Sequence, residues 1–113
     1  MTWHKTGVAA DTIAPGATRE VLVGATAVLL ARTARGFYAV EAVCPHIGGL
    51  LADGPLREDR VTCPEHAAVF DVTDGRVVAD PFGVEPPEGA VGPLRSYPVR
   101  VEAGLVEVDL SAP

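Results

Sequence analysis

Apolar and polar residues alternate along several short stretches of this chain. In the clearest case, valine and leucine alternate with charged residues in Val99–Glu102 and again in Val106–Leu110, and Glu102-Ala103-Gly104 stands between the two runs. Successive side chains of a strand point to opposite faces, and glycine favours tight hairpin turns. We therefore predict a C-terminal β-hairpin with one buried face.

Six similar runs precede this hairpin, and turn-forming residues separate them. They are Arg19–Val23, Val28–Thr33, Phe37–Val43, Arg60–Thr62, Val69–Val72 and Arg76–Val78. Twelve glycines and ten prolines interrupt the chain at short intervals and leave little room for long helices. With a first strand around His4, the pattern predicts eight or nine short strands in an all-β antiparallel sandwich or barrel.

The length and the remaining loop fit a single domain. The 113 residues are enough for one hydrophobic core. Asp80–Pro93 contains four prolines and is predicted to be a long ordered loop, not a linker. We therefore treat residues 1–113 as one domain.

Charge and hydropathy limit the partners. Fifteen acidic against nine basic residues give a net charge of −6, which disfavours nucleic acid and suits a basic protein partner, or reflects solubility alone. The N-terminus has no apolar signal segment, and the longest apolar run, Ala27–Ala31, is too short to cross a bilayer. We expect a cytoplasmic protein that binds neither nucleic acid nor membrane.

The residues with distinctive chemistry lie in two short segments. Cys44-Pro45-His46 is followed, sixteen residues later, by Cys63-Pro64-Glu65-His66. These segments contain both cysteines of the chain and two of its three histidines. Thiolate and imidazole are strong ligands for iron and zinc, so the pattern predicts a metal centre on Cys44, His46, Cys63 and His66.

This spacing resembles the Rieske family, in which two cysteines bind one iron of a [2Fe–2S] cluster and two histidines bind the other. The resemblance implies Cys44 and Cys63 on one iron, and His46 and His66 on the other. It also implies a Rieske-type sandwich with a small cluster-binding subdomain formed by two loops, at about 43–50 and 62–71.

Four neighbouring positions bear on the redox potential. Gly49 and Glu65 stand where high-potential Rieske proteins carry an extra disulfide, and Ala68 and Phe70 stand where those proteins have a serine and a tyrosine that donate to the cluster. Such donors stabilise the reduced form, so we expect a potential at the lower end of the Rieske span, ~−150 mV. Ala67 departs from the glycine that small bacterial Rieske ferredoxins usually have after the second histidine.

Other readings of the four residues remain open. Two cysteines and two histidines also make a structural zinc shell, although the one-residue gap in Cys44-Pro45-His46 is shorter than zinc modules usually have. A hydrolase with a Cys–His pair is a further alternative, but no third group that orients the pair is evident. A last alternative is that the cysteines are ordinary buried residues and the histidines have no role. It would not explain why all four residues occur together in two short segments.

The resemblance implies an electron carrier and not an enzyme. An oxygenase site needs two more histidines and a carboxylate, and only His4 remains outside the cluster set. We expect the ferredoxin component of a multicomponent oxygenase, such as a dioxygenase. It would take electrons from a flavin-dependent ferredoxin reductase and dock transiently near His46 and His66, as a monomer. The alternative is a non-shuttling subunit like the small subunit of assimilatory nitrite reductase.

Overall fold

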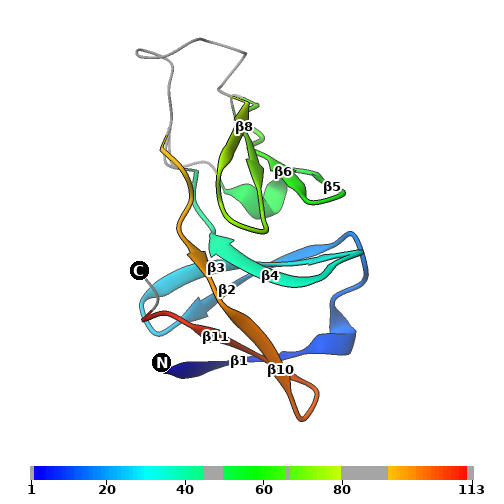
Figure 1. The fold of residues 1–113 in the computed structure, drawn as a ribbon, viewed down its shortest axis with the longest axis vertical. Coiled ribbons are helices and arrows are strands. Elements are labelled where there is room, and N and C mark those ends of the chain that lie inside the picture. Colours follow the sequence, from blue (N-terminus) through cyan, green and yellow to red (C-terminus); the bar gives the residue numbers. More distant parts are fainter. Residues whose placement is uncertain (1, 45–49, 66, 80–91, 112–113) are drawn as a thin grey trace.

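The computed structural model describes residues 2–44, 50–65, 67–79 and 92–111 (Figure 1). Within these ranges the chain forms eleven β-strands and two short 3-10 helices, η1 (Ala10–Thr12) and η2 (Leu51–Asp53). The all-β prediction is confirmed. The two strands beyond the predicted nine, β5 (Leu56–Arg57) and β9 (Ser96–Tyr97), are only two residues long, which is too short for an alternating pattern to be visible.

The strands form three antiparallel sheets. The first has the order β1-β11-β10, with bounds Trp3–Ala9, Leu105–Asp109 and Val99–Glu102. The second has the order β2-β3-β4-β9, in which β2 is Thr18–Val23, β3 is Thr26–Thr33 and β4 is Gly36–Glu41. The third has the order β5-β6-β7-β8, in which β6 is Arg60–Thr62, β7 is Val69–Asp71 and β8 is Val77–Ala79.

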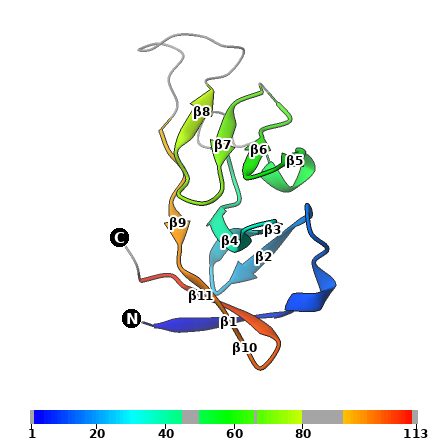
Figure 2. The same cartoon turned by 45° about the vertical axis from the view of Figure 1, so that its right-hand side comes forward.

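The third sheet forms a small subdomain on one side of the other two (Figures 1 and 2). The chain enters this subdomain after β4 and returns to the larger part at β9. Strand β9 then pairs with β4 through Ala39↔Tyr97 and Val40↔Ser96. This pairing returns the chain to the second sheet, beside the strand from which it left for the subdomain.

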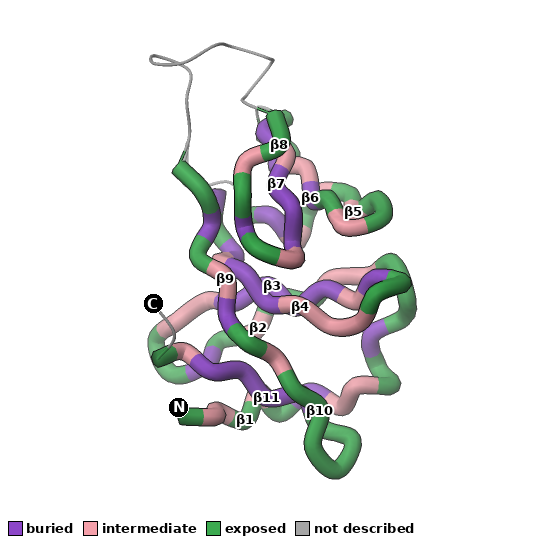
Figure 3. The backbone as a smooth tube through the Cα atoms, viewed as in Figure 1, coloured by how far each residue is buried: buried purple, intermediate pink, exposed green. Residues whose placement is uncertain are grey.

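Strand β3 is buried on both of its faces (Figure 3). Val28, Leu29, Leu30 and Ala31 are four successive residues, and all have an exposed fraction of 0%. Val28 and Leu30 point into the core between the first and second sheets, whereas Leu29 and Ala31 point into the core shared with the subdomain. A continuous apolar run is the pattern expected for a strand covered on both faces.

The predicted C-terminal hairpin is confirmed. Strands β10 and β11 pair from Val99↔Val108 to Glu102↔Leu105, and Ala103 and Gly104 form the turn with φ of 53° and 80°. Two successive positive φ values are characteristic of the type I′ turn that joins hairpin strands.

The expectation of a single buried face was wrong for β11. Val106 and Val108 are buried as predicted, but Glu107 and Asp109 are buried as well. The Arg100 guanidinium contacts the Glu107 carboxylate at 2.8 Å and lies 4.5 Å from the centre of the Trp3 ring. Neighbouring side chains therefore cover the charged face of the strand.

The described part of the chain contains no helix that has both the length and the apolar character required to cross a bilayer. The predicted loop Asp80–Pro93 lies outside the described residues, except for Gly92 and Pro93.

Candidate metal centre

Cys44 stands at the start of the first ligand loop, and paired backbone closes the base of that loop. Val43 and Leu50 form an antiparallel bridge across it, and the Leu51 N–H donates to the Ala42 carbonyl at 3.0 Å. Only 1% of Cys44 is exposed. The two ends of the loop are therefore held together immediately beside the first cysteine.

Cys63 stands at the start of the second loop, where β6 ends. Its N–H donates to the Ala68 carbonyl at 2.7 Å, and its own carbonyl accepts from the Ala67 N–H at 3.0 Å. Cys63 and Ala68 are both buried. These two hydrogen bonds close the turn of the second loop on its first ligand.

Ala67 has φ of 63°, in the left-handed region that favours glycine. A glycine at this position would adopt this conformation without the steric cost that an alanine has.

Gly54 fixes the position of the second loop against η2. A Cβ atom at Gly54 would lie 1.7 Å from the Thr62 carbonyl oxygen and 3.3 Å from the Pro64 ring. The φ of Gly54 is −96°, which any residue can adopt. Glycine is therefore required by close packing and not by its backbone conformation.

The two cysteines belong to one buried cluster, although nineteen positions separate them. They are not joined in a disulfide. Leu51, Val61 and Phe70 belong to the same cluster, so the thiols lie in an apolar and largely dry environment. Thiolate ligands beside an apolar core fit an iron–sulfur cluster, whose properties depend on exclusion of water.

The other two predicted ligands, His46 and His66, lie outside the described residues, as does Gly49. Among the residues that are described, no group of three His, Cys, Asp or Glu side chains could hold a metal ion. The four-ligand set therefore stays a prediction. The third histidine, His4, lies in β1 opposite Val108, in the first sheet.

Three residues that we expect to affect the redox potential, Ala68, Phe70 and Glu65, lie within the described part of the chain. Ala68 and Phe70 have an exposed fraction of 0%, and both lie in the buried cluster that contains the cysteines. Glu65, at one of the positions where high-potential Rieske proteins carry the extra disulfide, is exposed. Buried apolar side chains at 68 and 70 offer no hydroxyl to a sulfur atom.

The turn after β7 is held by contacts to the Asp71 carboxylate. Asp71 accepts hydrogen bonds from the Thr73 N–H, at 2.8 Å, and from the Thr73 hydroxyl. Burial alone would raise the pKa of Asp71. These hydrogen bonds, the Arg76 guanidinium at 3.3 Å and the nearby Arg60 together outweigh burial and leave the pKa lowered from 3.8.

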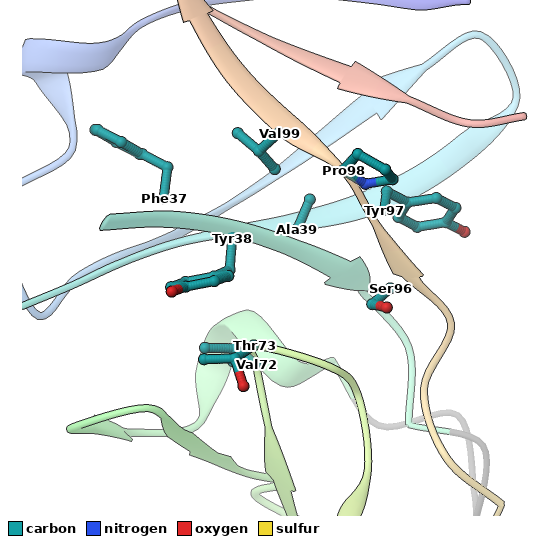
Figure 4. Close-up of a pocket in the computed structure, with 9 residues that line it drawn as sticks. All are labelled: Phe37, Tyr38, Ala39, Val72, Thr73, Ser96, Tyr97, Pro98 and Val99. Carbon is teal, nitrogen blue, oxygen red and sulfur yellow. The ribbon is translucent and has the colours of Figure 1, made fainter. Parts of the chain in front are cut away.

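A groove of about 390 Å³ marks the junction between the subdomain and the second sheet (Figure 4). Tyr38 projects from β4 on the side of Val72 and Thr73, which belong to the subdomain. The residues that line it are Phe37, Tyr38, Ala39, Val72, Thr73, Ser96, Tyr97, Pro98 and Val99. Neither cysteine is among them, so the groove is separate from the metal centre.

The family model of the Rieske [2Fe-2S] domain matches residues 2–98. The chain belongs to this family. It is 30% identical to sulredoxin of Sulfurisphaera tokodaii over 97% of this chain and 100% of that protein. It is also 37% identical to the 3-phenylpropionate/cinnamic acid dioxygenase ferredoxin subunit of Escherichia coli K12, over 66% of this chain and 63% of that subunit.

Solved structures show the same fold. The ferredoxin of carbazole 1,9a-dioxygenase from Nocardioides aromaticivorans IC177 has a TM-score of 0.81 and 26% identity, with 96% of this chain and 97% of that one covered. A complex of reduced oxygenase and oxidized ferredoxin in carbazole 1,9a-dioxygenase contains a chain with a TM-score of 0.78 and 34% identity, over 94% of this chain and 91% of that one.

Membership in this family identifies the cofactor, and the similarity to ferredoxin components indicates the class of function. The protein carries a Rieske-type [2Fe–2S] cluster and is an electron-transfer component, not itself a catalyst. The predictions of the fold, the cofactor and the role as a carrier are confirmed. Sequence reasoning missed Gly54, although its position after Asp53 is typical of a turn.

Proposed function

We propose that this Rieske protein carries single electrons from a flavin-dependent ferredoxin reductase to a terminal oxygenase. Cys44, His46, Cys63 and His66 would hold the cluster, one cysteine and one histidine from each loop. When bound, the cluster accepts and releases one electron at a time. The oxygenase partner is suggested by the carbazole dioxygenase complex, in which a similar ferredoxin occurs together with an oxygenase.

The two buried cysteines carry this proposal. Each stands at the start of a loop that backbone hydrogen bonds close, and both belong to one apolar cluster without a disulfide. This arrangement would provide two thiolates for one iron, and the segments that follow would supply the histidines for the other. Residues 43–50 and 62–71 would thus form the cluster-binding loops of a single domain, 1–113.

We further propose that partners dock transiently near His46 and His66, because imidazole ligands at the edge of a cluster shorten the path to an acceptor. Small interfaces, below ~1,200 Å², suit such exchange. A monomer fits a carrier that must leave one partner to reach the next. The cytoplasmic location stays a prediction from the sequence.

The test is an EPR and optical spectrum of anaerobically purified protein, together with iron and acid-labile sulfide counts. We expect two irons and two sulfides per chain and the rhombic EPR signal of a reduced Rieske cluster. His46→Ala and His66→Ala should abolish that signal. The matched control is His4→Ala, which removes the one histidine outside the ligand set and should leave the spectrum unchanged.

Zinc without sulfide, or an unchanged spectrum in His66→Ala, would contradict the ligand assignment. Stable co-purification with one large enzyme, without reduction by a separate reductase, would favour the subunit alternative over the shuttle. Size-exclusion chromatography with light scattering tests the monomer.

A further inference from the structure

The third sheet has a buried and an open face. Antiparallel partners project their side chains to the same face. Leu56, Val61 and Phe70 are matched across β5, β6 and β7 and pack inward. The opposite face therefore presents the pairs Arg57↔Arg60, Arg60↔Asp71 and Thr62↔Val69.

Two arginines stand directly opposite each other on this open face. Arg57 and Arg60 are cross-strand partners, and both are exposed. Neither has an ion-pair partner within the part of the chain that the structure describes. Like charges directly opposite each other are destabilising, whereas Arg60 also faces Asp71 on β7 and lowers the pKa of that carboxyl.

The two aspartates near these arginines form ion pairs with other basic residues. Asp59 forms an ion pair with Arg35 at 2.8 Å, across the turns β3–β4 and β5–β6. The Asp71 carboxylate accepts a hydrogen bond from Thr73 and forms an ion pair with Arg76. Glu58, in the turn between the two arginines, forms no ion pair with any described residue.

The arginines border a groove of about 470 Å³ on the open face of the third sheet. It is lined by Arg57, Glu58, Arg60, Thr62 and Val69. Thr62 is followed in the chain by Cys63, which is buried in the cluster beneath this face. Arg60 stands three residues, or ~10 Å of strand, from Cys63.

The groove therefore combines the uncharged Thr62 and Val69 with two arginines and one acid, Glu58. An uncharged patch permits close approach of a partner, and charges around it steer the encounter. The sign of the two arginine charges is opposite to the net charge of −6 of the whole chain.

We propose that this groove is a docking surface for an electron-transfer protein with an acidic surface, whose carboxylates would pair with Arg57 and Arg60. Acidic residues elsewhere on the chain would favour a basic partner. The carrier would then distinguish this acidic partner from a basic one by charge. This inference rests on the proposed role as a carrier and adds the chemistry of one partner.

The test uses two probe proteins of opposite surface charge. Reduced holoprotein is mixed in a stopped-flow instrument with the carboxylate-rich haem domain of cytochrome b5 or with lysine-rich cytochrome c. We expect Arg57→Gln with Arg60→Gln to lower the second-order rate constant with cytochrome b5 on the order of 3- to 10-fold at low salt, and not to lower it with cytochrome c.

The matched control is Lys5→Gln with Arg19→Gln, which makes the same change in net charge on exposed residues of β1 and β2. A second readout, independent of electron transfer, is the shift of amide NMR signals when cytochrome b5 is added. These shifts should gather at residues 57–62 and disappear in the Arg57/Arg60 variant.

Equal rate losses in both double variants, or NMR shifts away from residues 57–62, would overturn the proposal, because net charge alone or another face would then be responsible. A different outcome is expected if the protein is not an electron carrier at all. In that case the wild-type protein would show no reducible cluster and would transfer no electron to either cytochrome.

Discussion

The backbone N–H of Cys63 donates to the carbonyl of Ala68 at 2.7 Å, and both residues are buried. The hydrogen bond joins the first residue of the second loop to the residue at which β7 is about to begin. The bond thereby closes the base of the loop between β6 and β7, and this loop begins with the predicted ligand Cys63. The conformation of the residue between these ends, Ala67, therefore affects the ligand geometry directly.

Replacement of Ala67 by glycine should stabilise the protein. The left-handed conformation costs an L-residue about 1–2 kcal/mol, whereas glycine costs about 0.5–1 kcal/mol in chain entropy. With φ of 63° at Ala67, we expect a net gain of about 0.5–1 kcal/mol in the free energy of unfolding, measured by chemical denaturation.

The matched control is Ala103→Gly, because Ala103 also has a positive φ, of 53°, in the β10–β11 turn. It should stabilise the fold by a similar amount. Ala67→Gly should in addition slow the loss of the cluster, which Ala103→Gly should not. Equal cluster lifetimes in the two variants would mean that Ala67 does not influence the ligand loop.

Gly54→Ala should destabilise the subdomain. The added methyl group would meet the Thr62 carbonyl oxygen at 1.7 Å, so η2 or the second loop must shift. Forced overpacking of this kind costs about 1–3 kcal/mol. Thermal unfolding and iron content per chain measure the effect.

Gly92→Ala is the control for Gly54→Ala. A Cβ atom at Gly92 has open space around it. We expect the melting temperature and the iron content of this variant to match those of the wild type. If Gly54→Ala were equally silent, the close approach of η2 to the second loop would not be needed.

Ala68→Ser combined with Phe70→Tyr should raise the midpoint potential. Both residues are buried in the cluster of side chains that contains Cys44 and Cys63, and hydroxyl donors to sulfur stabilise the reduced form. A redox titration followed by optical or circular dichroism spectroscopy measures the shift. Ala39→Ser places a hydroxyl in the other core and should leave the potential unchanged; an unchanged midpoint in the double variant would refute the argument.

Stability at acid pH should depend on Asp71. Its pKa is lowered in the folded state despite burial, so the carboxylate stabilises the fold above the unfolded pKa, near 3.8. This contribution is lost as the pH falls below that value toward the folded pKa. Asp71→Asn should therefore lower stability at neutral pH and flatten its decline between about pH 5 and pH 2. The exposed Asp53→Asn is the control, and parallel pH profiles for the two variants would argue against the role of Asp71.

The sequence by itself determined most of the fold class and the chemistry of the site. Alternation in Val99–Glu102 and in the residues after Gly104 predicted the hairpin, because one face of each strand is apolar. The spacing of Cys44, His46, Cys63 and His66 indicated a metal centre, and its resemblance to the Rieske family predicted the cofactor, because ligand identity and spacing are local properties of the chain.

Only the tertiary structure decided features that depend on what lies opposite a residue. The burial of Glu107 requires Arg100, and the burial of β3 on both faces requires the subdomain above it. The need for glycine at 54 arises from a carbonyl eight residues away, at Thr62. Sequence periodicity records the face on which a side chain lies, but which groups from distant strands cover that face is fixed only when the sheets pack together.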